Sequence, residues 1–464
     1  MRESLSAAIA TIGAPAFAQL YRLDRAMRRK LTPAGWLVFA TLVAAAIFGL
    51  NTQETFLYQV FGLAVGLLVV AGVASWKLRL RARLARALPQ VATAGAEFTY
   101  AVTVTNLGKN DLSGLEIEET FAAARPARAE FVRYKVREDR SRNVFDRLVG
   151  YPRWVSLMRW KTGARVERAR LSLVGSPLDH GALPAQSAWT ATLRCVPLRR
   201  GELRFDALTI SRDEPLGLMR ALWKHRLAET LLVMPRTYPV APIDLPGSRR
   251  LQPGGVAFAG RVGDAEEFVS LRDYRAGDSP RRIHWKAWAR TGRPVVKEYQ
   301  DEFFVRHALL LDTFPSGDAA HFKAAVSVAA SLAMMPRSGE SLLDLMFVED
   351  RAYTLTRGRG VGAASDLLRV LATVTPSRGT FATLAEAAIL NARRISGGIC
   401  VFLTWDAQRR DLVAALRGRG IPLRVWIVAE DGDPSLADPG PMGSDGRNFR
   451  VVNPANVAAE LLKP

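Results

Sequence analysis

The sequence predicts a protein of several domains: a pair of apolar helices near the N-terminus, then an all-β domain, then an α/β domain. Three patterns support this prediction: two charge-free apolar segments, a run of period-two alternation, and alternating strand and helix patterns after residue 303. The 464 residues exceed what one core usually organises, so two or three domains are expected. The hydrophobic fraction of 49% excludes a disordered chain.

Two apolar segments, residues 35–50 and 56–76, carry no charged side chain. The second has the roughly 20 residues that cross a bilayer, and the first approaches that length when the residues just before it are added. Because only the short stretch 51–55 separates them, we expect a transmembrane helical hairpin over residues 33–80, preceded by a cytoplasmic segment over residues 1–32. Two buried core helices are the alternative interpretation.

The formal net charge of +20 points to anionic partners, and much of it lies in two basic runs, residues 22–30 and 77–86. These runs flank the apolar pair, whereas the connecting loop holds no Lys or Arg, so the positive-inside rule places both ends in the cytoplasm. The lipid bilayer is therefore the first expected partner. The N-terminus imitates a signal peptide, but we expect no cleavage, because export would carry the basic run 22–30 to the wrong side. Cys195 and Cys400 fall in different predicted domains, which fits a reducing compartment and excludes a disulfide framework.

Period-two alternation over residues 88–236 predicts the all-β domain. The stretch EFTYAVTVTN alternates apolar with polar or small residues and ends at a turn beginning at Asn106. Many short strands without helical periodicity predict an immunoglobulin-like β-sandwich. Residues 122–163 interrupt the pattern and receive no assignment. The further strand candidates are LEIEETF, RARLSLV, AWTATLRCV, LRFDALTIS and ETLLVMP.

The second half of the chain begins with a linker and a basic segment, residues 237–302, and continues with an alternating region, residues 303–464. In that region FFVRHALLLD predicts a buried strand and DAAHFKAAVSVAASLAMM the helix after it, and the alternation continues to a last helix at PANVAAELL. Such alternation predicts a mostly parallel sheet covered by helices on both faces.

The basic segment predicts a short helix between Ser279 and Gly292. Ser279 can cap this helix, with Pro280 at its first position, and Gly292 ends it. Within it Arg282, Lys286 and Arg290 recur every fourth residue and form one basic stripe, so the helix is expected to be cationic on one side and apolar on the other.

Several interpretations of the basic stripe stay open. It can dock an anion or an acidic protein, because Arg and Trp are the side chains that most often anchor interfaces. It can also be neutralised internally, or simply join the two domains. Nucleic acid is not an expected partner, because no nucleic-acid module is recognisable and the chain is fixed at a membrane. The carboxylates available for internal pairing are Glu266, Glu267, Asp273, Glu298, Asp301 and Glu302.

The stretch EFVSLRDYRAGDSPRRIHWKAWARTGRPVVKEYQDE resembles the hallmark of the bacterial DUF58 family, whose pattern runs Glu-Phe, Arg-x-Tyr, Gly-Asp, Arg-x-Ile, Trp-Lys, Ala-Arg and a trailing Glu. The upstream stretch RRGELRFDALTISRDEPLGLMR and the apolar hairpin also resemble the family. The resemblance implies a multi-pass protein of the bacterial inner membrane with its main body in the cytoplasm. It also implies a von Willebrand factor A-like domain at residues 303–464 and frequent association with MoxR-type AAA+ ATPases. The matching positions are Glu267, Phe268, Arg272, Tyr274, Gly277, Asp278, Arg281 or Arg282, Ile283, Trp285, Lys286, Ala289, Arg290 and Glu298.

A von Willebrand factor A-like domain implies a divalent metal, such as Mg²⁺, at the carboxyl end of its sheet, held by Asp-x-Ser-x-Ser, a Thr and a second Asp. Asp312 and Ser316 match the ends of the first motif, and Thr380 and Asp406 stand where the other two ligands belong. Phe314 replaces the middle Ser, which removes a ligand and adds an apolar ring. We therefore favour a degenerate site in which the two aspartates cap helices or bind neighbouring backbone, and we expect no cofactor.

Signatures of other enzymes are missing from the sequence: it holds no phosphate-binding loop, HExxH helix or GxSxG elbow. GRGVGA lacks the acidic residue of a dinucleotide site, and His284 is expected to pack beside Trp285 instead of acting as a base. The expected function is a non-enzymatic, membrane-tethered scaffold that docks a MoxR-type AAA+ ATPase or another von Willebrand factor A protein, in complex assembly or envelope maintenance. The competing class is a metal-dependent hydrolase using Asp312 and Asp406. The expected interface residues are Arg272, Tyr274, Gly277, Asp278, Arg281, Arg282, Trp285, Lys286, Arg290 and Glu298.

Overall fold

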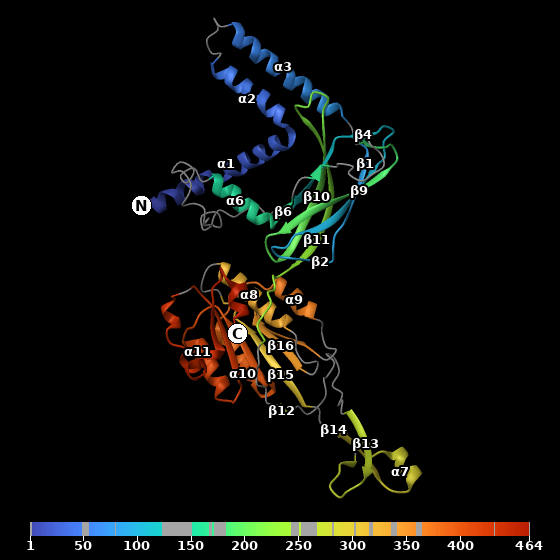
Figure 1. Cartoon of the computed structure of the whole chain (residues 1–464), viewed down its shortest axis with the longest axis vertical. Coiled ribbons are helices and arrows are strands. Elements are labelled where there is room, and N and C mark those ends of the chain that lie inside the picture. The colour runs from blue at the N-terminus through green and yellow to red at the C-terminus, as the bar shows by residue number, and fades with distance from the viewer. Residues whose placement is uncertain are drawn as a thin grey trace. The chain divides into compact units, whose positions relative to one another are not determined.

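The chain divides into two compact units, Met1–Met234 and Pro235–Pro464, in the computed structural model (Figure 1). The predicted all-β domain was expected to end close to this division, at residue 236. The structure describes residues 2–48, 55–78, 80–122, 151–166, 169–170, 182–242, 250–251, 267–280, 283–300, 303–314, 319–335, 341–358, 364–430 and 432–463.

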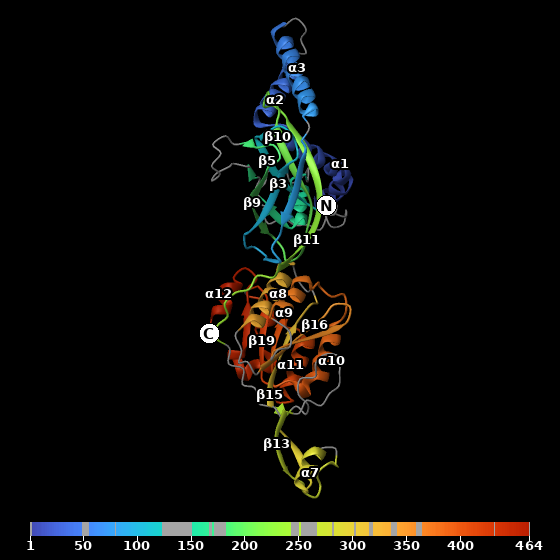
Figure 2. The same cartoon turned by 90° about the vertical axis from the view of Figure 1, so that its right-hand side faces the viewer.

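Three helices begin the first unit: α1 (Arg2–Lys30), α2 (Pro33–Phe48) and α3 (Thr55–Lys77). In α3, the segment Phe56–Lys77 is long and apolar enough to cross a membrane, whereas α2 is apolar but shorter. The described residues thus hold one helix of spanning length where the sequence predicted two crossing helices. Helices α2 and α3 lie side by side (Figures 1 and 2).

Two larger sheets follow in the first unit and share one hydrophobic core. Alternate residues of β3, such as Tyr100 and Val102, turn inward because side chains of a strand alternate between its faces. They join Leu203 and Phe205 of the other sheet in a single cluster. One sheet has the order β1 (Ala82–Ala87), β3 (Phe98–Asn106), β9 (Ala188–Pro197) and β6 (Ala164–Val166). The other has the order β2 (Val91–Thr93), β11 (Arg220–Met234), β10 (Gly201–Asp213), β5 (Leu115–Phe121) and β7 (Ala169–Arg170), and β4 (Leu112–Ser113) pairs with β8 (Ala182–Leu183).

Part of the stretch that received no assignment, residues 122–163, is a helix. Helix α6 (Tyr151–Thr162) places Trp154 and Leu157 against Phe17 of α1 in a small apolar cluster. Residues 123–150 lie outside the described part of the chain.

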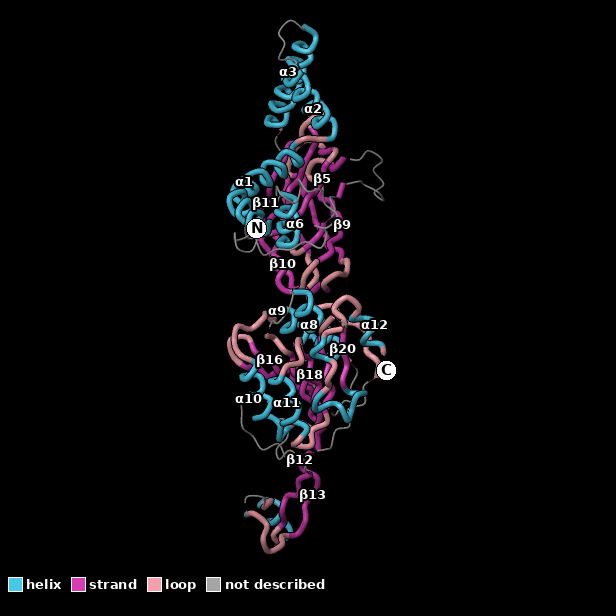
Figure 3. The backbone as a smooth tube through the Cα atoms, turned by 90° about the vertical axis from the view of Figure 1, so that its left-hand side faces the viewer, coloured by secondary structure: helices cyan, strands magenta, loops and turns pink. Residues whose placement is uncertain are grey.

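The second unit is built on one sheet with helices on both faces (Figures 2 and 3). The neighbours from β16 to β20 pair in parallel, and β17 adds an antiparallel edge. The mixed α/β class with several sheets is thus confirmed. The sheet order is β17 (Ala352–Arg357), β16 (Ser341–Val348), β15 (Phe303–Leu311), β18 (Gly397–Phe402), β19 (Leu423–Val428) and β20 (Phe449–Val452), with β12 (Arg250–Leu251) also paired to β15. Helices α8 (Ala319–Met334), α9 (Ala364–Thr373) and α12 (Val457–Leu462) pack on one face, and α10 (Phe381–Asn391) and α11 (Ala407–Arg417) on the other. Short 3₁₀ turns complete the unit at Ala392–Arg394, Pro434–Leu436 and Gly440–Asn448.

A separate two-stranded sheet carries the basic segment. Strands β13 (Glu267–Asp273) and β14 (Val295–Gln300) pair antiparallel, and helix α7 (Trp285–Thr291) lies between them in sequence. We call residues 267–300 the arm.

Candidate functional site

A bidentate ion pair holds the first turn of the arm. Arg272 donates from Nη1 to Oδ2 of Asp278 at 2.8 Å and from Nη2 to Oδ1 at 2.7 Å. The same carboxylate accepts from the backbone N–H of Arg275 at 2.8 Å. These bonds, led by the one from Arg272, lower the pKa of Asp278 from its ordinary value of 3.8 to about 2. Gly277 takes a φ of 108° in this turn, a region that favours glycine.

The helix of the arm is shorter than predicted. It begins at Trp285, and its N-cap is His284, whose Nδ1 accepts from the backbone N–H of Ala287 at 2.9 Å. The prediction that one helix starts at Pro280, with Ser279 as its cap, was wrong. The reason is non-local: Ile283 forms a bridge with Val296, and His284 donates its backbone N–H to Val295. This pairing with β14 keeps Ile283 and His284 out of the helix.

The end of the helix follows the prediction. Gly292 adopts the left-handed conformation, with a φ of 66°, and returns its N–H to the carbonyl of Trp288 at 2.9 Å. His284 therefore has a local structural role as a cap, where the sequence suggested only that it packs beside Trp285.

Helix α7 presents aromatic and cationic side chains to solvent. None of its residues, all of which the structure describes, is buried. Trp285 is 63% exposed and stacks on Trp288 with ring centroids 5.2 Å apart. Lys286 and Arg290 are exposed, and neither has an ion-pair partner among the described residues. Tyr274 is exposed as well.

The predicted interface residues thus separate into two groups. Arg272, Gly277 and Asp278 build the turn, and Arg272 bonds to Asp278 within the arm. The second group is exposed at the surface and consists of Tyr274, Trp285, Lys286 and Arg290. Arg281, Arg282 and the side chain of Glu298 lie outside the described residues.

A second group of predicted residues meets at the carboxyl end of the large sheet. Thr380 is the N-cap of α10 and Asp406 the N-cap of α11, and both line a hollow of about 490 Å³. Asp312 follows β15 and is fully buried. The predicted ligand Ser316 lies outside the described residues.

Arg409 joins the two aspartates, and sequence reasoning missed it. Its Nε and Nη2 donate to Oδ2 of Asp312 at 3.1 and 2.9 Å, and its Nη1 donates to Asp406 at 2.5 Å. The guanidinium also lies 4.2 Å from the centre of the Phe381 ring. The available signal was the position of Arg409 in the first turn of a helix capped by Asp406, which puts the two side chains on one face.

The predicted ligands that the structure describes at this end of the sheet do not fit a divalent metal. Both oxygens of Asp312 are in use, because Oδ1 accepts from the N–H of Phe314 at 2.9 Å and Oδ2 from Leu403 and Arg409. Burial raises the pKa of Asp312, and the Arg409 charge opposes that rise. A guanidinium therefore already supplies the positive charge that a metal would bring. Among the described residues no group of three His, Cys, Asp or Glu side chains could hold a metal ion.

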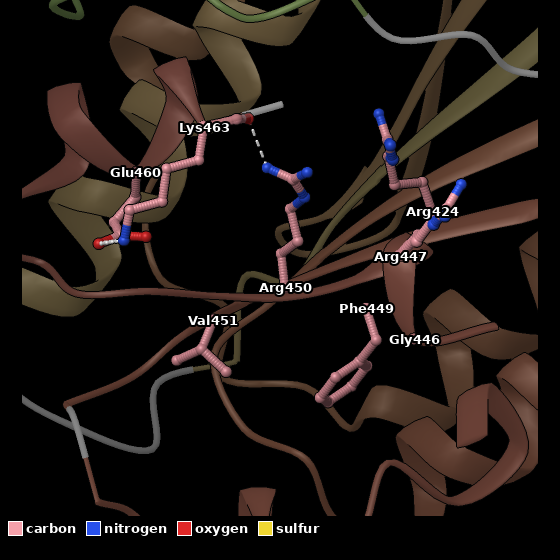
Figure 4. Close-up of a pocket in the computed structure, with 8 residues that line it drawn as sticks. All are labelled: Arg424, Gly446, Arg447, Phe449, Arg450, Val451, Glu460 and Lys463. Atoms are coloured by element: carbon pink, nitrogen blue, oxygen red, sulfur yellow. Dashed lines mark hydrogen bonds and ion pairs between the residues drawn. The ribbon is translucent and has the colours of Figure 1, made fainter. Parts of the chain in front are cut away.

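A further hollow of about 630 Å³ lies beside β19 and β20 and is rich in arginine (Figure 4). Arg450 donates to the carbonyl of Lys463 and lies 5.5 Å from the centre of the Trp426 ring. Arg424 donates to Asn448 at 3.0 Å, and Lys463 pairs with Glu460 at 2.6 Å. Much of the charge in this hollow is thus engaged in holding the sheet edge together.

Comparison with known proteins gives a family and one relative. Residues 270–438 match the family described as "Protein of unknown function DUF58". The uncharacterised protein YeaD of Bacillus subtilis (strain 168) is 31% identical over 139 residues, which is 29% of this chain and 32% of YeaD. The chain thus aligns with about a third of the length of this curated relative.

Likenesses to solved structures are weak. The mussel byssus proximal thread matrix protein 1 is 13% identical with a TM-score of 0.27, over 34% of this chain and 44% of that one. The PapD-like domain 7 of human CEP192 is 10% identical with a TM-score of 0.16, over 33% of this chain and 87% of that one. Scores this low establish no shared fold. The family assignment rests on the sequence match, and the chain carries a DUF58 region at residues 270–438, as its motif predicted.

Proposed function

We propose that this chain is a non-enzymatic, membrane-tethered interaction protein whose arm docks an acidic protein partner. The observation that carries the proposal is the exposed surface of α7, where Trp285 lies beside Lys286 and Arg290. A tryptophan that is 63% exposed keeps much of its apolar surface in water, and a partner that covers the ring would remove this cost. Tryptophan and arginine are also the residues that most often dominate binding free energy.

The arm is organised before a partner arrives, which lowers the entropy lost on binding. The Arg272–Asp278 ion pair fixes the turn, His284 and Gly292 fix the two ends of α7, and the two indole rings stack on each other. The positive charge of Lys286 and Arg290 would steer an acidic surface toward the aromatic pair. We propose a MoxR-type AAA+ ATPase as that partner, with another von Willebrand factor A protein as the second candidate, in complex assembly or envelope maintenance.

The tether is the helical pair α2 and α3. Large apolar side chains of α3 face outward, including Leu63 at 66% exposure and Trp76 at 83%, as suits lipid. We infer that both helices enter the inner membrane with their outer ends in the cytoplasm. The shared core of the two sheets supports an immunoglobulin-like sandwich in the first unit, and the parallel sheet covered on both faces supports a von Willebrand factor A-like second unit.

Binding of the purified chain to a MoxR-type AAA+ ATPase, measured by interferometry in nanodiscs, tests the proposal. The double variant Lys286→Glu with Arg290→Glu, and separately Trp285→Ala, should each weaken binding at least tenfold. The matched control reverses two exposed charges elsewhere in the second unit, Lys323→Glu with Arg393→Glu, and should bind as the wild type does. Equal affinity of all four proteins, or no binding by any, would overturn the proposal.

A metal-dependent hydrolase at Asp312 and Asp406 finds no comparable support. Arg409 takes up the carboxylate oxygens that such a reaction would need for its metal.

A further inference from the structure

The turn between β10 and β11, residues 214–219, packs against the membrane-facing helices. Thr32, just before α2, donates its N–H to the carbonyl of Leu218 at 3.1 Å, and Ser75 of α3 donates to the carbonyl of Arg220 at 3.1 Å. A Cβ atom on Gly35 of α2 would lie 1.9 Å from the Leu218 oxygen, so the contact is as close as two backbones allow. Figures 1 and 2 show the tip of this strand pair beside the helices.

The contact reaches into the apolar part of α3. Met219 places its sulfur 3.9 Å from where a Cβ atom on Gly72 would stand. Gly72 lies inside the apolar segment Phe56–Lys77, about 7.5 Å along the helix axis from Lys77 at 1.5 Å per residue. That depth corresponds to the boundary between headgroups and acyl chains, roughly 5–10 Å into the membrane.

The turn satisfies its own backbone N–H groups, which lipid could not do. The Glu214 carboxylate accepts from the backbone N–H groups of Leu216, Leu218 and Met219 at 2.5, 2.7 and 3.2 Å. Gly217 donates its N–H to the carbonyl of Glu214. Pro215 has no N–H to satisfy. Every N–H from residue 215 to residue 219 is therefore satisfied, and Glu214 itself is buried.

What the turn leaves exposed is apolar. Leu216 is 47% exposed at the tip, and Pro215 beside it is exposed too. We propose that the β10–β11 turn is a third membrane-contacting element, in which Leu216 inserts into the bilayer interface next to α2 and α3. This inference rests on the proposed membrane tether. It adds that the all-β domain touches lipid directly and is held in a fixed orientation to the bilayer.

The test uses variants of the full chain in nanodiscs, each with one added cysteine that carries an environment-sensitive fluorophore. The two native cysteines are buried, so the label should react with the added one. The variants are Leu216→Cys, Leu63→Cys in the middle of α3, and Val91→Cys. Val91 is exposed and pairs with Leu232 at the opposite end of β11, about 40 Å from Arg220 at 3.3 Å per residue. Emission is quenched in parallel by nitroxide lipids and by aqueous iodide.

The proposal expects lipid to quench more strongly than iodide at Leu216→Cys and Leu63→Cys, and the reverse order at Val91→Cys. If Leu216→Cys behaves like Val91→Cys while Leu63→Cys is quenched by lipid, the turn does not insert but the tether stands. If Leu63→Cys is quenched by iodide as well, the membrane tether itself fails. Thermal unfolding of each labelled variant checks that the label has not displaced the turn.

Discussion

Arg409 donates from both Nε and Nη2 to one oxygen of the buried Asp312, at 3.1 and 2.9 Å, and thereby joins the carboxyl end of β15 to α11. The side chains are 7% and 0% exposed, so neither charge has water to compensate it. The sequence suggested Asp312 as a metal ligand. In the structure Asp312 instead has a structural role, because it pairs with Arg409 at the carboxyl end of the sheet.

Removal of the Arg409 side chain should lower the free energy of unfolding. Arg409→Ala leaves a buried carboxylate without its counter-charge, which typically costs about 3–5 kcal/mol. Hydrogen exchange of the β15 and β18 amides, measured by mass spectrometry on the full chain, reports this loss locally. The control Lys463→Ala breaks an exposed pair with Glu460 and should cost no more than about 1 kcal/mol. Equal protection in the two variants would contradict the importance of the buried pair.

Magnesium should not bind at the carboxyl end of the sheet. Asp312 already accepts from Phe314, Leu403 and Arg409, and a metal would have to displace a guanidinium that makes bonds to two aspartates. Calorimetric titration of the chain with Mg²⁺ should therefore give no heat beyond dilution. A binding heat that disappears in Asp312→Ala would restore the metal-dependent hydrolase as the better hypothesis.

The turn of the arm should persist in acid. The Arg272 hydrogen bonds lower the pKa of Asp278 from 3.8 to about 2, so the folded arm holds the carboxylate more strongly ionised than the unfolded chain does. The stabilisation is therefore full above about pH 4 and is lost as the pH falls through about 2. Carbon NMR of labelled aspartate, assigned with Asp278→Asn, should show this titration. In Arg272→Gln the midpoint should rise toward 3.8; an unchanged midpoint would show that Arg272 is not the cause.

The sequence predicted local patterns well and long-range bonds poorly. The strands and helices of residues 303–464 follow from apolar periodicity, because their core faces are continuous. The start of α7 did not follow, because pairing of Ile283 with Val296 outweighs the local cap signal at Ser279. Strand β11 begins at Arg220, well before the predicted strand at Glu229, because its first half alternates with charged residues and carries little apolar signal.

The candidate sites show the same contrast between local signals, which the sequence reveals, and long-range contacts, which it does not. The motif covers the residues that fold as the arm, but the pairing of β13 with β14 was not predicted. Trp285 is exposed, and its role at an interface stays a prediction. Arg409 was missed because its meaning depends on Asp312, which lies far away in sequence and meets it only after the sheet has formed. The sequence predicted no strand at β1, whose residues fall largely in the basic run 77–86. The arginines of β1 mask the alternation of buried and exposed residues along this strand. One of them, Arg86, is fully buried against Glu119, a pairing that the sequence alone does not reveal.

Gly35 should be intolerant of any side chain. In Gly35→Ala the new methyl group would have to share space with the Leu218 carbonyl, 1.9 Å away, and backbone atoms cannot swing aside as a flexible side chain could. The helix would have to move away from the β10–β11 turn, which also breaks the bond from Thr32 to Leu218, for a cost of about 1–3 kcal/mol.

The matched control is Gly62→Ala in α3, where nothing in the described part of the chain lies within 4 Å of the added carbon. Alanine forms helix better than glycine by about 1 kcal/mol, so this variant should be as stable as the wild type or more so. Unfolding temperatures of both variants in one detergent, together with protease cleavage at residues 214–219, measure the difference. If Gly35→Ala and Gly62→Ala unfold at the same temperature and residues 214–219 of Gly35→Ala resist the protease, the helices and the turn do not make the contact described. The proposal that Leu216 inserts into lipid then loses that support.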